Sequence, residues 1–181
     1  FFSSWKDGIS YIISHRLILA LMVLGLAPTV IAMPYTNLLP IFASDIFHGG
    51  ARTQGILLTM IGIGSVIGAL TMASLGRKQG DGMILLVGAA GFGLSLVFFA
   101  QSPYIWMAMI FSLLGGLLLT GYRSQNQTII QTTVPPELRG RVLGIYLLDK
   151  GLMPLGSLFA GILASLIGGP WAVTIMGASC F

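Results

Sequence analysis

The sequence predicts an all-α membrane protein. Of its 181 residues, 55% are hydrophobic and only 8% are charged, and the mean hydropathy is +0.93. Soluble domains carry about 25% charged residues, so only a lipid bilayer can solvate a surface this poor in charge. The apolar residues are also gathered into long runs, which short polar, glycine- or proline-containing segments separate. This arrangement is typical of several membrane-crossing helices joined by short loops.

The first 16 residues predict a short amphipathic helix that precedes the first span. Four apolar residues share one helical face: Trp5, Ile9, Ile12 and Ile13. A helix of this kind lies in the plane of the membrane interface. We therefore expect a linker helix over residues 1–16 and a transmembrane helix bundle over residues 17–181.

The apolar runs predict five complete spans and the beginning of a sixth. The expected spans are Leu17–Phe42, Gly55–Leu75, Met83–Ala100, a span from Tyr104 onward, one within Val142–Ile167, and the start of one at Pro170–Phe181. The expected loops are 43–54, GRKQGDG, QSP, VPPELRGR and GGP. The last segment rises only about 18 Å as a helix, whereas the hydrocarbon core is roughly 30 Å thick. We therefore expect a truncated sixth span and a chain that is a fragment.

Prolines and glycines indicate how two of the spans pack. Pro28, Pro34 and Pro40 lie inside the first span and predict kinks, which neighbouring helices must compensate. Gly64 and Gly68 form a GxxxG pair in the second span, which lets another helix approach closely.

The basic residues predict the orientation of the chain. Six of them fall at the N-terminus and in alternate loops: Lys6, Arg16, Arg77, Lys78, Arg139 and Arg141. Arg52 is the only basic residue in the opposite loops. By the positive-inside rule, the N-terminus and the loops with Arg77 and Arg139 are cytoplasmic. The net charge of +4 therefore reflects topology, and we expect no nucleic-acid partner.

Signals of enzyme or metal chemistry are missing from the sequence. It contains no HExxH, Gly-x-Ser-x-Gly or Walker motif. The single cysteine, Cys180, excludes an internal disulfide and a multi-cysteine metal site. His15 and His48 lie at span edges, far apart in the chain, where a histidine is usually just solvated. We expect no enzyme activity, no cofactor and no metal site.

The polar run GYRSQNQTII at 121–130 follows a segment built for lipid, and two interpretations account for it. In the first, the span is complete at Tyr122, and Tyr122 and Arg123 mark the cytoplasmic interface. In the second, the helix continues to Thr133 and one polar face lines a wet path. That face would consist of Thr120, Arg123, Gln127 and Gln131. The sequence favours neither interpretation.

Asp149 and Lys150 pose the same question on the next helix. They either flank a span at Gly151–Ile167, or Asp149 is a buried carboxylate that exchanges a proton during transport. The fourth and fifth spans form an antiparallel hairpin, which brings Arg123 and Asp149 to a similar depth and makes a pairing sterically plausible.

Two long segments carry a resemblance to a known family. PPELRGRVLGIYLL, followed by GLMPLGSLFAGILASLIGG, resembles the tenth-to-eleventh-helix region of major facilitator superfamily transporters. WKDGISYIISHRLILALMVLG and the following MPYTNLLPIFASDIFHGGARTQGILLTMIGIGSVIGAL resemble the central linker with helices seven and eight. The transmembrane secretion effector group is the most similar subfamily. Gly76, Arg77 and Lys78 match the end of the family's loop motif, but Ala73 stands in place of its aspartate, and Arg139 and Arg141 match the basic positions of the other cytoplasmic loop.

The resemblance implies the C-terminal six-helix half of a twelve-helix exporter whose halves enclose a cavity and rock in alternating access. We therefore expect a secondary active transporter of the bacterial inner membrane that exports a small amphipathic compound, such as a siderophore or drug, driven by protons. The candidate path residues are Asn37, Thr120, Arg123 and Gln127, and Asp149 is the candidate for proton coupling. The expected partners are the substrate, membrane lipid and the N-terminal half of the same chain. A non-transporting six-span anchor or assembly subunit is the alternative, and the packing glycines fit it equally well.

Overall fold

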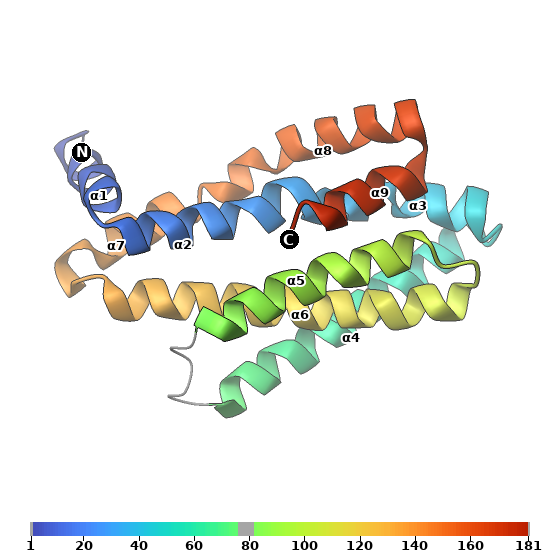
Figure 1. The fold of residues 1–181 in the computed structure, drawn as a ribbon, viewed down its shortest axis with the longest axis horizontal. Coiled ribbons are helices and arrows are strands. Elements are labelled where there is room, and N and C mark those ends of the chain that lie inside the picture. Colours follow the sequence, from blue (N-terminus) through green and yellow to red (C-terminus); the bar gives the residue numbers. More distant parts are fainter. Residues whose placement is uncertain (1, 76–81, 181) are drawn as a thin grey trace.

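The computed structural model describes residues 2–75 and 82–180, leaving aside the side chains of residues 2–7, 27, 29, 75, 149 and 150, and nearly all of this part is helical (Figure 1). No strand occurs in these ranges. The helices long and apolar enough to cross a membrane lie within 16–46, 50–74, 82–100, 105–133 and 136–167. The prediction of an all-α membrane protein with five complete spans is confirmed.

One extended residue separates the first helix from the first span, and the two helices meet at an angle (Figure 1). Helix α1 (Phe2–Ser14) is followed directly by α2 (Arg16–Ala27), with only His15 between them. Along the predicted apolar face of α1, Ile12 is buried and Ile9 and Ile13 are exposed.

The first span is a broken helix, as its prolines predict. After α2 it passes through a π-helix, η1 (Pro28–Ala32), a 3₁₀ helix, η2 (Met33–Leu38), a short α3 (Leu39–Ile41) and a second π-helix, η3 (Phe42–Ile46). A proline has no N–H and cannot continue the α-helical hydrogen-bond pattern, so the backbone changes its winding where the prolines occur.

The predicted loop at 43–54 is wrong in extent. The first span remains helical to Ile46, and α4 (Gly50–Leu75) begins at Gly50. His48 and Gly50 have φ angles of 50° and 58°. These left-handed conformations reverse the chain within a few residues, so a long loop is unnecessary.

The third, fourth and sixth hydrophobic segments form single helices. They are α5 (Gly82–Ala100), α6 (Ile105–Thr133) and α9 (Gly169–Ala178). Helix α6 contains 29 residues and is about 43 Å long, which exceeds a hydrocarbon core of roughly 30 Å. The helix therefore continues through the polar run to Thr133, as the second interpretation expects. The placement of the membrane interface at Tyr122 and Arg123 stays a prediction.

The fifth span is interrupted near its start. Helix α7 (Pro136–Tyr146) begins inside the segment VPPELRGR that we predicted to be a loop, and this prediction is wrong. Pro136 is favoured in the first turn of a helix because its missing N–H would have no partner there, and Glu137 suits the positive N-terminal end. Leu147 and Leu148 form a turn before α8 (Asp149–Ile167).

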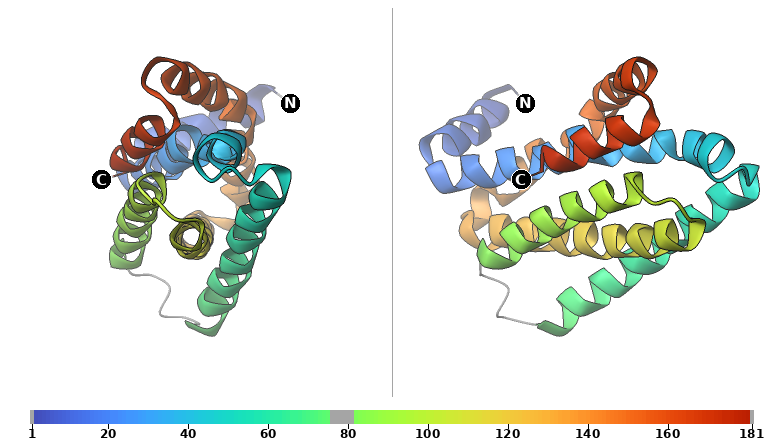
Figure 2. Two further views of the ribbon diagram at one scale, coloured as in Figure 1. Left: turned by 90° about the vertical axis from the view of Figure 1, so that its right-hand side faces the viewer. Right: turned by 45° about the vertical axis from the view of Figure 1, so that its right-hand side comes forward.

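Helix α6 lies between α4 and α5 (Figure 2). The predicted close approach at the GxxxG pair is confirmed. A methyl group added at Gly64 would lie 2.0 Å from the carbonyl oxygen of Leu113, and one at Gly68 would lie 2.4 Å from that of Leu117. Only glycine allows the backbones of α4 and α6 to come this close.

Two apolar cores stabilise the bundle, one toward each end. One contains Tyr35, Phe42, Phe92 and Phe99, with ring centroids of Phe42 and Phe99 4.9 Å apart. The other contains Ile12, Ile18, Tyr122, Ile130 and Val142. The second core lies at the end of the bundle that carries Arg16, Arg139 and Arg141, which we call the basic end; it is the left end in Figure 1.

Candidate functional site

The polar run of α6 faces the broken first span. Arg123 is half-buried, and its Nη2 atom lies 3.3 Å from the sulfur of Met33. Met33 is the first residue of η2, at the junction between the π-helix and the 3₁₀ helix. The charged group of α6 therefore lies at the point where the winding of the first span changes.

Directly beside Arg123, α6 compensates for a missing hydrogen bond of the first span. In an α-helix the carbonyl of Leu24 would accept from the N–H of residue 28, but Pro28 has none. The hydroxyl of Tyr122 donates to this carbonyl. Asn126 Nδ2 donates to the carbonyl of Leu21 at 3.1 Å. Polar side chains of α6 thus donate hydrogen bonds to the last two turns of α2. Such bonds are needed because a backbone carbonyl inside a membrane has no water to pair with.

Helix α8 holds the broken span from another side. The carbonyl of Val30, whose α-helical partner would be Pro34, lies against Gly156, where an added methyl group would be 2.1 Å from the oxygen. Seven residues after Val30, Asn37 donates from Nδ2 to Oγ of Ser157, the residue that follows Gly156, at 2.7 Å. The irregular segment therefore lies between α6 and α8.

The structure brings together only part of the predicted path. Asn37 is exposed apart from its bond to Ser157, and it lies four residues after Met33, which Arg123 contacts. Thr120 is half-buried and Gln127 is exposed, about one turn on either side of Arg123 on the same face of α6. Their role in transport stays a prediction.

The remaining predicted residues are described only in part. Asp149 begins α8, and its side chain lies outside the described part of the structure, as do Arg77 and Lys78 altogether. Arg139 and Arg141 are exposed on α7.

The two histidines lie at the surface. His15 is exposed and stacks on Tyr11 with ring centroids 4.0 Å apart, and His48 is also exposed. Among the described residues, no group of three His, Cys, Asp or Glu side chains is placed to hold a metal ion.

The two most buried polar residues of the run, Gln125 and Asn126, are not among the residues predicted for the path. Gln125 is 1% exposed and Asn126 is fully buried. Among the described residues, both amide atoms of Gln125 and the Oδ1 atom of Asn126 have no hydrogen-bond partner. Pro28 could have pointed to the role of Tyr122. Because proline has no N–H, the carbonyl of Leu24 needs a donor from another helix. No comparable signal points to Gln125.

Comparisons with known proteins agree on one family of transporters. The family model described as transmembrane secretion effector matches residues 1–181. The chain is 32% identical to the staphyloferrin A transporter of Staphylococcus aureus over 80% of its length. It is 26% identical to the multidrug efflux pump Tap of Mycolicibacterium fortuitum over 90%, and 35% identical to the enterobactin exporter EntS of Salmonella typhi over 53%. No solved structure gives a significant match.

The matched relatives are considerably longer than this chain. The alignments cover 36% of the staphyloferrin A transporter, 40% of the Tap pump and 23% of the enterobactin exporter. The chain thus spans less than half the length of the curated relatives it matches.

Proposed function

Because the chain belongs to the transmembrane secretion effector family of major facilitator transporters, we propose that it forms the C-terminal six-helix half of an exporter in a bacterial inner membrane. The substrate is a small amphipathic compound, a siderophore or a drug, and protons drive the export. The relatives' names, which include siderophore and macrolide transporters, support this substrate class. The basic end is cytoplasmic in this proposal, because it gathers the positive charges.

The observation that carries the proposal is the contact of Arg123 with the broken first span. Exposed, stacked Tyr104 and Trp106 mark one membrane interface. Arg123 lies about 27 Å along the helix from Ile105, just inside a core of roughly 30 Å. A charged side chain at such a place faces the protein interior or a water-filled cavity rather than lipid. In other transporters, broken helices form substrate sites because their free helix ends and unwound backbone groups can bind the substrate.

In this proposal the four path residues line the wall of the cavity, with Gln127 nearest the cytoplasmic end and Asn37 deeper in the bundle, beside Tyr35 of the far core. Arg123 contacts the broken span at Met33, four residues before Asn37, and Thr120 and Gln127 extend the polar face along α6. Asp149, at the start of α8 and next to the interruption of the fifth span, exchanges the proton. The irregular winding of the first span allows the conformational change of alternating access.

The path is tested by exchanging single arginines in the complete transporter. Arg123→Gln should lower efflux at least tenfold at an unchanged membrane level, because the path loses its fixed charge. Arg139→Gln is the matched control, since Arg139 is exposed on α7, and it should retain efflux. The assay measures export of a siderophore, a macrolide and ethidium from cells. If the wild-type protein reaches the membrane but exports none of a broad panel of compounds, the proposal of transport is wrong. The alternative, a six-span anchor or assembly subunit, then takes its place.

Proton coupling is tested at Asp149 in reconstituted vesicles. Asp149→Asn should abolish export driven by a pH gradient while retaining exchange of labelled for unlabelled substrate, since exchange requires no net proton movement. If the variant still accumulates substrate against its gradient, Asp149 does not carry the coupled proton.

A further inference from the structure

Arg123 differs from the other described charged side chains in its depth. It lies about 27 Å along α6 from Ile105 and about 15 Å from Thr133, the two ends of the helix. The other charged side chains that the structure describes all lie within two turns of an end of their helical segment: Arg16, Asp45, Arg52, Glu137, Arg139 and Arg141. A charge this far from both ends of a span is typical of a path for polar or charged compounds.

The contact between Arg123 and Met33 orients the charge without cancelling it. The Nη2 atom lies 3.3 Å from the sulfur of Met33, and a thioether is a weak, uncharged acceptor. Asp149 and Lys150, at the start of α8, have opposite charges. The sum over Arg123, Asp149 and Lys150 is therefore positive, whichever of them pair, and it becomes more positive when Asp149 takes up a proton.

The other residues predicted for the path are neutral. Thr120 and Gln127 lie about one turn from Arg123 on α6, and Asn37 lies four residues after Met33 on the first span. Their hydroxyl and amide groups can donate hydrogen bonds to an anion, and they bring no negative charge that would attract a cation. The Coulomb energy between two charges grows as the surroundings become less polar than water. At membrane depth, the charge of Arg123 therefore favours an anion and repels a cation.

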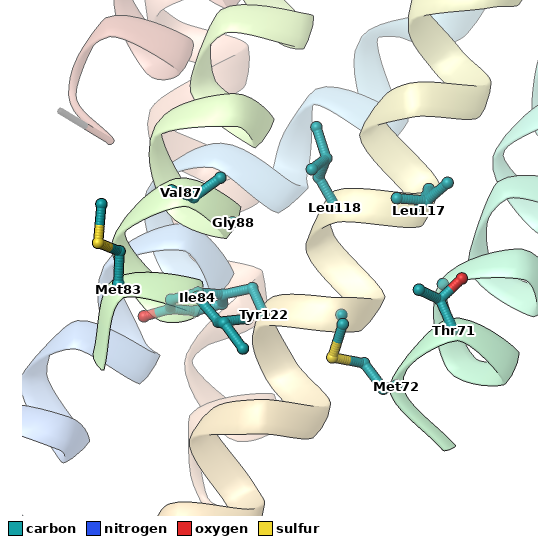
Figure 3. A pocket seen from close by; sticks show the side chains of 11 residues that line it. Thr71, Met72, Met83, Ile84, Val87, Gly88, Leu117, Leu118 and Tyr122 are labelled. Atoms are coloured by element: carbon teal, nitrogen blue, oxygen red, sulfur yellow. The ribbon is translucent and has the colours of Figure 1, made fainter. Parts of the chain in front are cut away.

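The apolar groove between α4, α5 and α6 does not compete for such a ligand (Figure 3). It has a volume of about 260 Å³, and apolar side chains, glycines, Thr71 and Tyr122 line it. None of the described residues in its lining is charged. A compound with an anionic group is therefore expected at Arg123 and not in this groove.

We infer that the path takes anionic substrates, and that Arg123 binds a carboxylate of the substrate through two parallel hydrogen bonds. The inference rests on the proposed function and narrows its substrate class. A guanidinium presents its N–H donors in a planar fork that matches the two oxygens of a carboxylate. Siderophores hold ferric iron, a hard cation, with oxygen ligands such as carboxylates. A carboxylate siderophore therefore fits the path, whereas a cationic drug meets a like charge.

The test compares two compounds that differ in charge but share one skeleton. The complete transporter is reconstituted in vesicles, and kcat/KM is measured for a carboxylate siderophore, for its methyl ester and for ethidium, after subtraction of the leak from empty vesicles. The wild type should prefer the acid at least tenfold over the ester and over ethidium. Arg123→Gln should lower kcat/KM for the acid at least tenfold and that for the ester less than threefold. Arg123→Lys keeps the charge without the fork, and it should retain part of the preference.

Arg139→Gln is the control variant, because it removes an exposed positive charge on α7 and should leave the ratio of acid to ester unchanged. An equal loss for acid and ester in Arg123→Gln would indicate a structural role and overturn the inference. A wild type that prefers the ester or ethidium would also overturn it, and this comparison needs no variant to fold. Export of those compounds would leave the proposed function standing. A folded wild type that moves none of the three compounds would instead overturn the proposed function together with this inference.

Discussion

The backbone carbonyl of Val30 lies in direct contact with Gly156 of α8, so that a methyl group at Gly156 would be 2.1 Å from the carbonyl oxygen and 2.8 Å from Cγ of Pro34. Because Pro34 cannot donate to Val30, this carbonyl would otherwise face a neighbouring side chain. The glycine lets the α8 backbone cover it, with a Cα–H group as a weak donor. The contact joins the irregular part of the first span to the fifth span.

Gly156→Ala should therefore destabilise the protein. The added methyl group forces α8 away from the broken span, and overpacking of this kind costs about 1–3 kcal/mol. Gly161→Ala on the same helix is the control, because an added methyl group there meets nothing within 4 Å. Alanine favours the helix over glycine by up to about 1 kcal/mol, so the control should melt at the wild-type temperature or above. Thermal unfolding in detergent measures both, and equal melting temperatures would contradict the contact.

Tyr122→Phe should destabilise the protein because it removes the donor to the Leu24 carbonyl. A buried acceptor left without a partner costs about 1–3 kcal/mol. Tyr104→Phe is the control, since Tyr104 is exposed at the opposite end of the bundle.

A double-mutant cycle with Pro28→Ala tests the cause. Alanine at position 28 restores an N–H group that can donate a hydrogen bond to the Leu24 carbonyl. Tyr122→Phe should then cost less in the Pro28→Ala background than in the wild type. The same cost in both backgrounds would show that Tyr122 does not substitute for the missing N–H.

The bond between Asn37 and Ser157 should couple the broken span to α8 energetically. Asn37→Ala and Ser157→Ala each remove the 2.7 Å hydrogen bond, so the double variant should be no less stable than the more damaging single variant. We expect an interaction energy of about 0.5–1.5 kcal/mol, the net value of a typical hydrogen bond. Denaturant-free thermal unfolding of the four proteins gives the cycle, and strictly additive effects would show that the two residues do not interact.

Two buried serines should respond differently to alanine. Ser112 Oγ is buried and has no hydrogen-bond partner in the part of the chain that the structure describes, whereas Ser95 Oγ donates to the carbonyl of Phe92 at 2.7 Å. Ser112→Ala removes an unsatisfied polar group and should be neutral or stabilising, while Ser95→Ala should cost up to about 1 kcal/mol. The reverse order of melting temperatures would indicate that Ser112 has a partner in the membrane.

The membrane class, the five spans and the kinks of the first span followed from the sequence because long apolar runs and prolines act locally. The prediction was wrong where a short signal overrode composition. His48 and Gly50 close a turn that we expected to be a long loop, and Pro136 begins a helix inside a segment rich in loop residues. Neither effect depends on hydrophobicity, which guided the choice of spans.

The candidate site was less predictable than the spans. The polar run at 121–130 was recognised, but helical spacing alone could not tell which of its faces meets α2 and which meets α4 and α5. Tyr122 and Asn126 bond to the first span from about 100 residues away in the chain. Gln125 lies on the same face of α6 as Gly121, which packs against Met72 of α4. These assignments depend on how α6 is rotated within the bundle, and that rotation is fixed by close glycine contacts such as Gly64 on Leu113.

The bonds from Tyr122 and Asn126 to α2 also bear on how the protein is made. A ribosome delivers α2 to the membrane before α6, and N-terminal elements assemble first during synthesis. The carbonyls of Leu21 and Leu24 are therefore already in the bilayer when the polar turn of α6 emerges. A circularly permuted chain that begins at α4 and places α2 last would expose the amide of Asn126 to lipid during insertion. Such a chain should depend more strongly on membrane chaperones than the natural order does.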